Sequence, residues 1–260
     1  MASSNAEPRS DMVLREDANH VCTLTLNRPE KRNAINKPMF DQLRRHVRDI
    51  EENGRDIGIV VLKGAGSSFC AGHDLADNSG GQDAFAWLRV EALTLEKFSR
   101  LRQPVIAAVQ GPCYTGGLEL ALSTDFILCS ESARFGDTHG KFGLVPGGWG
   151  MSQRLPRRVG ASKAMEMSVT CRTYTGAEAA AMGLANECVA DGTLDQRVAE
   201  WCEMILANSW HSNAANKRVI YDTDGLSLSQ GIVHEMMRNE GFDKERRRTS
   251  ATRFQSKEAG

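Results

Sequence analysis

The stretch "YTGGLELAL", residues 114–122, places one carboxylate, Glu119, inside an otherwise apolar run that follows a glycine pair. If the run forms a buried helix, an ionised Glu119 loses its hydration and needs a partner or a shifted pKa. Glu119 lies three residues after Gly116, so it would sit beside whatever the Gly116 N–H binds. The stretch alone leaves two interpretations open: a functional carboxylate, or one paired with an arginine in the core.

A second loop, "SFCAGHDL" at residues 68–75, has the same layout as the loop that leads into residues 114–122. Each follows a predicted buried strand, residues 57–64 and 103–111, and each supplies glycine and small residues before a helix. Glycine-rich helix starts expose N–H groups that the helix leaves unsatisfied. Two such loops suit a phosphate or a developing oxyanion, although one alone would indicate only close packing.

Hydrophobic periodicity predicts alternating strands and helices over most of the chain. Residues 20–29 alternate as a strand does, and residues 37–54 show helical spacing. Two short strands are expected within residues 125–136, and further helices at 84–100, 162–169, 176–182, 194–208 and 228–241. This alternation predicts an α/β fold with mostly parallel strands. We expect a disordered lead-in at 1–11, a core at 12–200 and a helical C-terminal region at 201–260.

The composition excludes several classes of protein. A net charge of −1 over 260 residues gives no electrostatic case for nucleic acid or an anionic membrane. No apolar run approaches the roughly 20 residues that a membrane helix needs. The seven cysteines are odd in number, scattered and without a C-x-x-C pair. They indicate reduced thiols in a cytoplasmic protein, with neither a disulfide framework nor a zinc site.

Four motifs carry a resemblance to a known family: "NRPEKRNAIN" (27–36), "FCAGHDL" (69–75), "AAVQGPCYTGGLELALSTDFILCSESARFG" (107–136) and "GLVPGGWGMSQRLPRRVG" (143–160). By their order and spacing, the chain resembles the enoyl-CoA hydratase/isomerase (crotonase) superfamily from about residue 21 to about residue 207. The resemblance implies a ββα superhelix with a C-terminal helical trimerisation region. It also implies homotrimers or dimers of trimers, an acyl-CoA thioester substrate, and no metal or redox cofactor.

The resemblance also implies roles for particular residues. In this family the backbone N–H groups at the positions of His73 and Gly116 bind the thioester oxygen; position 115, commonly glycine in relatives, is threonine here. Lys31 and Arg32 would contact the CoA phosphates and Ala34 the pantetheine arm, whereas without the resemblance this segment would be a charged turn. The remaining substrate-contact candidates are Ala71, Asp74 and Leu75.

The acyl pocket is expected around Trp87, Leu88, Phe142 and Trp149, with Trp149 as an accessory site residue. The His73 imidazole either lines the acyl or pantetheine channel or points to solvent. Met236, Met237 and Phe242 are expected to be packing residues.

One departure from the family pattern concerns the second catalytic glutamate. Family hydratases use two glutamates, one at the position of Glu119, and ungapped alignment puts His139 at the other. Asp137, in a segment expected to be extended, would lie on the same side as His139. Glu119 would activate water and His139 would protonate the α-carbon. Alternatively, His139 is a hydrogen-bonded wall residue, or it forms a coupled ion pair with a carboxylate.

The leading functional prediction is reversible hydration of a 2-enoyl-CoA. Other chemistry on an acyl-CoA stays open: thioester hydrolysis, C–C cleavage, decarboxylation or isomerisation. A third possibility is an acyl-CoA-binding protein without turnover, because the usual second acid is missing.

Overall fold

The computed structural model describes residues 11–77 and 84–238. The chain divides into two compact units, the first ending at Trp210 and the second beginning at His211. The expected lead-in falls almost wholly outside the described residues, as does Phe242. The expected boundary between residues 200 and 201 stays a prediction.

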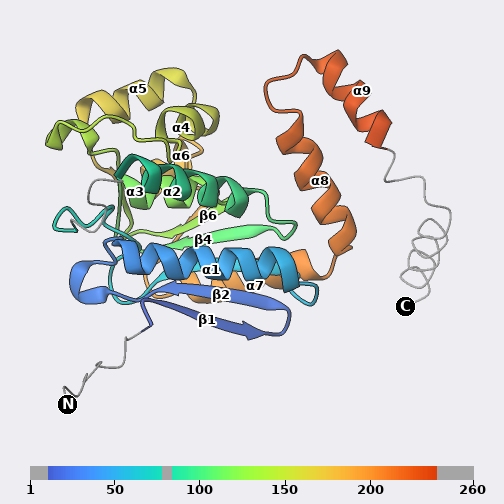
Figure 1. Cartoon of the computed structure of the whole chain (residues 1–260), viewed down its shortest axis with the longest axis horizontal. Coiled ribbons are helices and arrows are strands. Elements are labelled where there is room, and N and C mark those ends of the chain that lie inside the picture. Colours follow the sequence, from blue (N-terminus) through green and yellow to red (C-terminus); the bar gives the residue numbers. More distant parts are fainter. Residues whose placement is uncertain (1–10, 78–83, 239–260) are drawn as a thin grey trace. The chain divides into compact units, whose positions relative to one another are not determined.

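The first unit is built on a six-stranded sheet (Figure 1) with the strand order β1-β2-β3-β4-β6-β9. The strands are β1 (Val13–Ala18), β2 (Val21–Leu26), β3 (Ile59–Gly64), β4 (Val105–Val109), β6 (Phe126–Ser130) and β9 (Glu187–Val189). β1 pairs antiparallel with β2, and every later pairing in this sheet is parallel. The prediction of a mostly parallel α/β sheet is therefore confirmed.

A second, three-stranded sheet holds the segments that lead to the candidate site. It joins β5 (Pro112–Tyr114), β7 (Arg134–Gly136) and β8 (Tyr174–Thr175), with β5 parallel to β7. The chain passes from β4 to β5 through Gly111, where φ is +55° and an added Cβ would lie 2.0 Å from the Ser67 carbonyl oxygen. Only glycine fits this corner. Two strands followed by a helix, as in β4-β5-α3, form the expected ββα repeat.

Seven helices in the described part of the chain lie wholly within the first unit: α1 (Lys37–Asn53), α2 (Ala84–Ser99), α3 (Gly116–Leu122), α4 (Met151–Val159), α5 (Ala161–Thr170), α6 (Gly176–Ala181) and α7 (Leu194–Leu206). Two short 3-10 helices of the described chain are η1 (Pro29–Lys31) and η3 (His139–Phe142). Helix α1 begins where Asn36 accepts a hydrogen bond from the Met39 N–H. Its buried stripe includes Phe40, Leu43 and Val47 at helical spacing.

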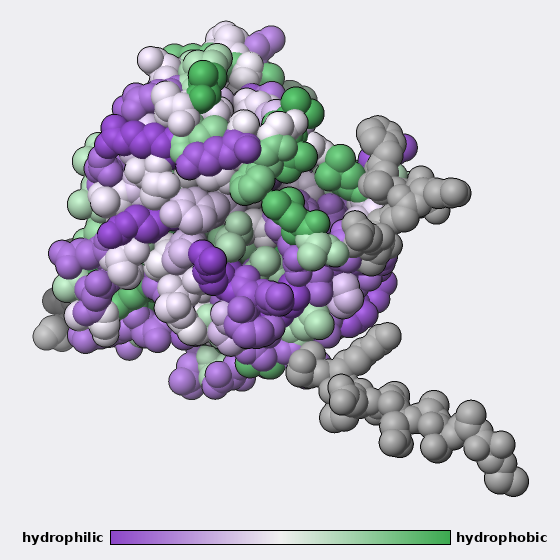
Figure 2. Space-filling model, turned by 90° about the vertical axis from the view of Figure 1, so that its left-hand side faces the viewer, coloured by the Kyte–Doolittle hydropathy of each residue, from purple (hydrophilic) through white to green (hydrophobic). Residues whose placement is uncertain are grey.

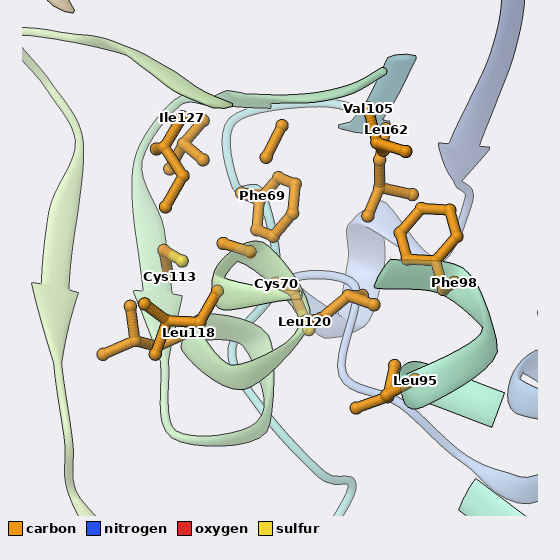
Figure 3. Close-up of a cluster of buried hydrophobic side chains, with 14 of the residues drawn as sticks. Leu62, Phe69, Cys70, Leu95, Phe98, Val105, Cys113, Leu118, Leu120 and Ile127 are labelled. Carbon is orange, nitrogen blue, oxygen red and sulfur yellow. The ribbon is translucent and has the colours of Figure 1, made fainter. Parts of the chain in front are cut away.

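The six-stranded sheet separates two apolar clusters, because successive strand residues face opposite sides. Val60 and Leu62 belong to the larger cluster, together with side chains of α1 and α2. Ile59 and Val61 belong to the smaller cluster, which α7 covers with Leu194, Val198 and Cys202. Figure 3 shows α3 within the larger cluster, with Leu118 and Leu120 beside Cys70 and Cys113. The short helix that carries Glu119 is therefore fixed by core packing.

The described part of the second unit contains two helices. They are α8 (Trp210–Asp222), whose first residue belongs to the first unit, and α9 (Leu228–Arg238). Helix α9 exposes five large apolar side chains: Leu228, Ile232, Val233, Met236 and Met237. Among the residues that the structure covers, no helix combines the length and apolar character required to cross a bilayer.

Candidate active site

Glu119 is buried in α3, with 2% of the residue exposed. Its Oε1 accepts a hydrogen bond of 2.9 Å from the backbone N–H of Met151, the first residue of α4. Burial raises the pKa of Glu119, and the Met151 N–H and the nearby His139 and His73 oppose this effect only in part. Within the described chain no arginine pairs with Glu119, which removes the simplest structural explanation for a carboxylate at this position.

The two glycine-containing loops lie directly against each other. Cys70 N–H donates to the Pro112 carbonyl oxygen at 3.0 Å, and Tyr114 N–H donates to the Cys70 carbonyl oxygen at 3.1 Å. A Cβ added to Gly117 would lie 2.2 Å from the Cys70 carbonyl oxygen, so the helix start and the loop touch through their backbones. Sequence reasoning predicted both loops, and the structure brings them together.

The backbone N–H groups of His73 and Gly116 are close neighbours. A Cβ built on Gly116 would lie 3.5 Å from the His73 nitrogen, and one built on Gly72 would lie 3.6 Å from the Gly116 nitrogen. Neither N–H donates a hydrogen bond to any other residue that the structure describes. Two adjacent N–H groups without an internal acceptor can both bind one substrate oxygen.

Hydrogen bonds on both sides of His73 fix the orientation of its backbone. Ile35 N–H donates to the Gly72 carbonyl oxygen, and Asp74 N–H donates to the Ile35 carbonyl oxygen, each at 2.8 Å. The peptide that carries the His73 N–H is therefore held without help from the His73 side chain.

Asp137 and His139 form a hydrogen-bonded pair. Asp137 Oδ1 lies 2.7 Å from His139 Nδ1 and also accepts from the His139 backbone N–H at 3.2 Å. The expectation of an extended segment here is wrong: Thr138 has φ −107° and ψ 11°, and a 3-10 turn begins at His139. The contact arises because an Asp side chain readily bonds the backbone two residues ahead.

The electrostatics of this pair favour a charged imidazole. The hydrogen bond that His139 donates to the Asp137 carboxylate raises the pKa of His139, against the opposing effect of burial. Burial by itself would raise the pKa of Asp137, but hydrogen bonds from His139 and Ser168 outweigh it and the pKa is lowered. The negative charge of Glu119 also contributes to the raised pKa of His139, so the two candidate catalytic residues influence each other.

Thr115 links the Gly116 loop to the segment that carries His139. The Thr115 hydroxyl contacts the Thr138 hydroxyl and accepts from the Thr138 N–H at 3.2 Å. Its backbone has φ +50° and ψ −110°, a conformation that costs free energy for a β-branched residue. Threonine therefore occupies a position better suited to glycine, and it gains contacts with Thr138 there.

Trp149 is buried, as is a carboxylate that sequence reasoning missed, Glu91 of α2. Trp149 Nε1–H donates to Glu91 Oε2 at 3.1 Å, and the indole packs against the His73 ring with a centroid distance of 4.2 Å. Glu91 Oε2 lies 3.7 Å from His73 Nε2. A signal was present in the sequence, because Glu91 continues the apolar stripe formed by Leu88 and Leu95 at helical spacing.

The other pocket candidates differ in exposure. Figure 2 shows apolar surface gathered among polar residues on the side of the molecule where the chain runs from β7 to α4. In that segment Phe142, Leu144 and Val145 are exposed. Trp87 and Leu88 are half-buried and pack against the larger apolar cluster.

The predicted CoA-contact segment lies beside the His73 loop. Ala71 N–H donates to the Arg32 carbonyl oxygen at 3.0 Å, while the Lys31 and Arg32 side chains face solvent. Ala34 is half-buried, and its carbonyl oxygen accepts from Arg28. Leu75 is 63% exposed.

Asp74 differs from the other predicted contacts because its carboxylate is already paired. Its Oδ2 binds Arg28 Nη2 at 3.1 Å, and Oδ1 accepts from the Ala76 N–H. We therefore assign Asp74 a structural role, in which its contacts with Arg28 and Ala76 hold the His73 loop in place.

Sequence reasoning also missed Asn33, which holds this region together. The fully buried amide donates to the carbonyl oxygens of Ala65 at 2.9 Å and Ser68 at 2.7 Å, and Asn33 Oδ1 accepts from the Arg28 N–H at 2.9 Å. Asn33 also adopts φ +54°, which asparagine tolerates better than most residues.

Within the described ranges, no three His, Cys, Asp or Glu side chains are grouped as metal ligands would be.

The chain is similar to known proteins in both sequence and fold. The sequence model of the enoyl-CoA hydratase/isomerase family matches residues 16–259. The chain is 32% identical to the Arabidopsis thaliana protein named "Probable enoyl-CoA hydratase 1, peroxisomal", over 88% of this chain and 85% of the relative. The crystal structure of enoyl-CoA hydratase from Bacillus anthracis superposes with a TM-score of 0.88 at 31% identity, covering 95% of this chain and 96% of that one.

A third match is a Thermobifida fusca protein solved in complex with acetoacetyl-CoA. It has a TM-score of 0.80 at 28% identity and covers 87% of this chain and 92% of that chain. The fold is thus that of the crotonase superfamily. The chain belongs to the enoyl-CoA hydratase/isomerase family and is an enzyme of that family.

Proposed function

We propose that the enzyme reversibly adds water to the double bond of a 2-enoyl-CoA thioester. The observation that carries the proposal is the arrangement of the buried Glu119 in α3, three residues after Gly116, whose N–H lies close to that of His73; neither N–H donates to a residue that the structure describes. The hydratase names of the relatives and the acetoacetyl-CoA bound to the Thermobifida fusca protein support an acyl-CoA substrate.

In the forward direction, Glu119 takes a proton from water while the water oxygen bonds to the β-carbon. The π electrons of the double bond move toward the thioester, and the resulting enolate oxygen is bound by the N–H groups of His73 and Gly116. Loss of one such donor typically raises the barrier by about 3 kcal/mol. The His139 imidazolium then gives its proton to the α-carbon, which completes the 3-hydroxyacyl product.

Proton exchange with the solvent returns Glu119 and His139 to their starting protonation states. Glu119 ends the addition protonated and His139 ends it neutral, so Glu119 must lose a proton and His139 must gain one before the next turnover. The raised pKa values suit these roles, because a raised pKa makes the ionised Glu119 a stronger base and keeps more of His139 protonated at a given pH. The proposed reaction uses only substrate, water and these side chains, with no metal or redox cofactor.

Substrate contacts are part of the same proposal. The exposed Lys31 and Arg32 side chains would bind the CoA phosphates, and Ala34, Ala71 and Leu75 would line the path of the pantetheine arm. Main-chain bonds between this segment and the His73 loop support the assignment.

The test is loss of the enoyl-thioester absorbance with but-2-enoyl-CoA. Because general acid–base catalysis contributes about 10²–10⁴-fold, Glu119→Gln should lower kcat by that factor and His139→Ala by at least tenfold. Glu52→Gln, an exposed glutamate of α1, serves as the matched control and should retain wild-type turnover. Full activity of Glu119→Gln would refute the assigned base.

Thioester hydrolysis is the second candidate, because the Asp137–His139 pair resembles a carboxylate-oriented imidazole base. Hydrolysis would release free CoA thiol, which a thiol reagent detects in the same assay. Ligand-dependent thermal stabilisation without either signal would identify a binding protein.

Location and assembly complete the proposal. All seven cysteines are free, which supports a reducing compartment such as the cytoplasm, although the Arabidopsis relative is named peroxisomal. Fluorescence microscopy of a tagged full chain would decide between these two compartments.

A homotrimer or a dimer of trimers is supported by family membership and by the apolar side chains exposed on α9.

A further inference from the structure

Glu91 is a buried carboxylate that the proposed hydration does not use. It lies on α2, with 5% of the residue exposed, and its Oε2 accepts from the Trp149 indole N–H. Burial of a carboxylate is costly unless it is paired and hydrogen-bonded. Trp149 supplies one donor, and His73 Nε2 lies 3.7 Å from Oε2 as an ion-pair partner among the described residues. The cluster of His73, Glu91 and Trp149 thus unites three separate segments of the chain.

The His73 imidazole is not needed to orient the His73 N–H. Two main-chain bonds to Ile35 already fix that backbone. The ring nevertheless packs on Trp149 and lies close to Gly116, where an added Cβ would be 2.8 Å from Nδ1. The His73 side chain is 40% exposed, whereas that of Glu91 is 6% exposed. The ring is therefore an accessible polar group beside the two N–H groups proposed to bind the thioester.

His73 Nε2 and Glu91 Oε2 are close to each other but form no direct hydrogen bond. A separation of 3.7 Å between Nε2 and Oε2 exceeds the 2.7–3.2 Å range of a direct N–H···O bond. A hydroxyl group lying alongside both atoms suits such a pair, because its oxygen can accept from the imidazole N–H while its hydrogen is donated to the carboxylate. A purely apolar acyl chain would leave both groups without this additional partner.

Charge argues against an anionic acyl group at the same place. Glu91 and Glu119 are both buried carboxylates in contact with, or electrostatically coupled to, His73. A third carboxylate would be repelled by both.

We propose that His73 and Glu91 determine substrate specificity, selecting acyl-CoA thioesters whose acyl group carries a neutral hydroxyl beyond the reacting carbons. This inference rests on the proposed acyl-CoA site, and it names the class of acyl group that the site prefers.

The test compares matched thioesters in binding and in turnover. Calorimetry with the full chain measures the affinities for two matched pairs of esters: butanoyl-CoA with 4-hydroxybutanoyl-CoA, and pentanoyl-CoA with 5-hydroxypentanoyl-CoA. None of the four contains a double bond to hydrate. We expect at least one hydroxyl ester to bind about tenfold more tightly than the alkyl ester of equal chain length. The kcat/KM values of the corresponding 2-enoyl-CoA esters should show the same preference.

Variants then assign the preference to the cluster. His73→Leu and Glu91→Leu should each reduce the affinity ratio to about 1, and Glu91→Gln, which keeps an acceptor oxygen, should retain part of it. Leu93→Ala, an exposed position on the same helix, should keep the full ratio. The ratio is used because absolute affinity also depends on folding and on the rest of the site.

The outcomes separate this inference from the proposed reaction. A binding preference without hydration of any enoyl-CoA would refute the reaction and support the hydroxyl specificity. Hydration without a preference, a preference for carboxyl-bearing esters, or a ratio unchanged in both leucine variants would overturn the specificity.

Discussion

Asp137 and His139 illustrate what a sequence reveals of a site and what it conceals. Ungapped alignment placed His139 at the position of the second catalytic glutamate, and Asp137 was predicted to lie on the same side of the segment. The reason given was wrong, because the backbone turns at Thr138 and one carboxylate oxygen binds two nitrogens of His139. Residue spacing was enough to suggest that the two side chains are neighbours, but their hydrogen bond depends on a local turn.

Replacement of Asp137 tests this pair through the pH dependence of the proposed hydration. Glu119 must be ionised, so kcat/KM rises as the pH increases through its pKa, and His139 must be protonated, so kcat/KM falls as the pH increases through its pKa. Asp137 raises the pKa of His139. Asp137→Asn should therefore move the alkaline limb to lower pH and reduce kcat about tenfold, as measured from pH–rate profiles. An unmoved alkaline limb would show that His139 is not the acid.

Thr115 provides a prediction about stability. Outside the left-handed region alanine is usually more stable than glycine, but at φ +50° the order should reverse. Both Thr115→Gly and Thr115→Ala lose the contacts with Thr138, so their difference isolates the backbone strain. We expect the glycine variant to be more stable by about 1 kcal/mol in urea unfolding. Greater stability of the alanine variant would refute the strain.

Glu91 and Asn33 were not predicted, because their roles depend on distant residues. Glu91 meets Trp149, 58 positions away, and Asn33 meets Ser68, 35 positions away. The helical spacing of Glu91 with Leu88 and Leu95 indicated its burial, but only the tertiary fold supplies the bonding partners of Glu91 and Asn33.

At the level of elements, long periodic segments were predicted well and short or polar ones were missed. Helix α1 was predicted almost to the residue, because its apolar stripe is continuous. Helix α4 was missed because Gly150 precedes it and Pro156 lies inside it, both signals of a break. Strand β1, "VLREDA", is polar over much of its length, and pairing with β2 stabilises it. Sequence periodicity cannot report such pairing.

The contact between α3 and the Cys70 loop is the element-level feature on which the site depends. Gly117→Ala would place a Cβ 2.2 Å from the Cys70 carbonyl oxygen, a backbone clash that no side-chain rotation relieves. We expect a loss of about 3 kcal/mol in the free energy of unfolding and loss of turnover.

Gly147→Ala is the matched control for that substitution. Its Cβ would meet Leu88 Cδ1 at 3.6 Å, an ordinary contact, and its backbone is not left-handed. Its stability should change by less than about 1 kcal/mol in the same urea titration. Equal stability of the two variants would disprove the close α3–loop contact.

For the whole molecule, assembly is the property that a single chain reveals least. The resemblance implied trimers, and the structure of one chain adds the exposed apolar residues of α9. Sedimentation should give three or six times the mass of one chain. The double variant Met236→Glu and Met237→Glu should shift the population toward smaller species, because it puts charge where apolar packing is expected.

Glu235→Gln, on the same helix, should leave the sedimentation pattern unchanged. A wild-type protein that sediments as a monomer would refute the assembly.

The buried cysteines have a practical consequence for the whole enzyme. Burial raises the pKa of the Cys22 and Cys70 thiols to about 12 and that of Cys202 to about 11. A protonated, enclosed thiol is a poor nucleophile toward maleimides and peroxide alike. These three thiols should therefore resist oxidative damage and alkylation while the chain is folded, and become reactive only when the core opens.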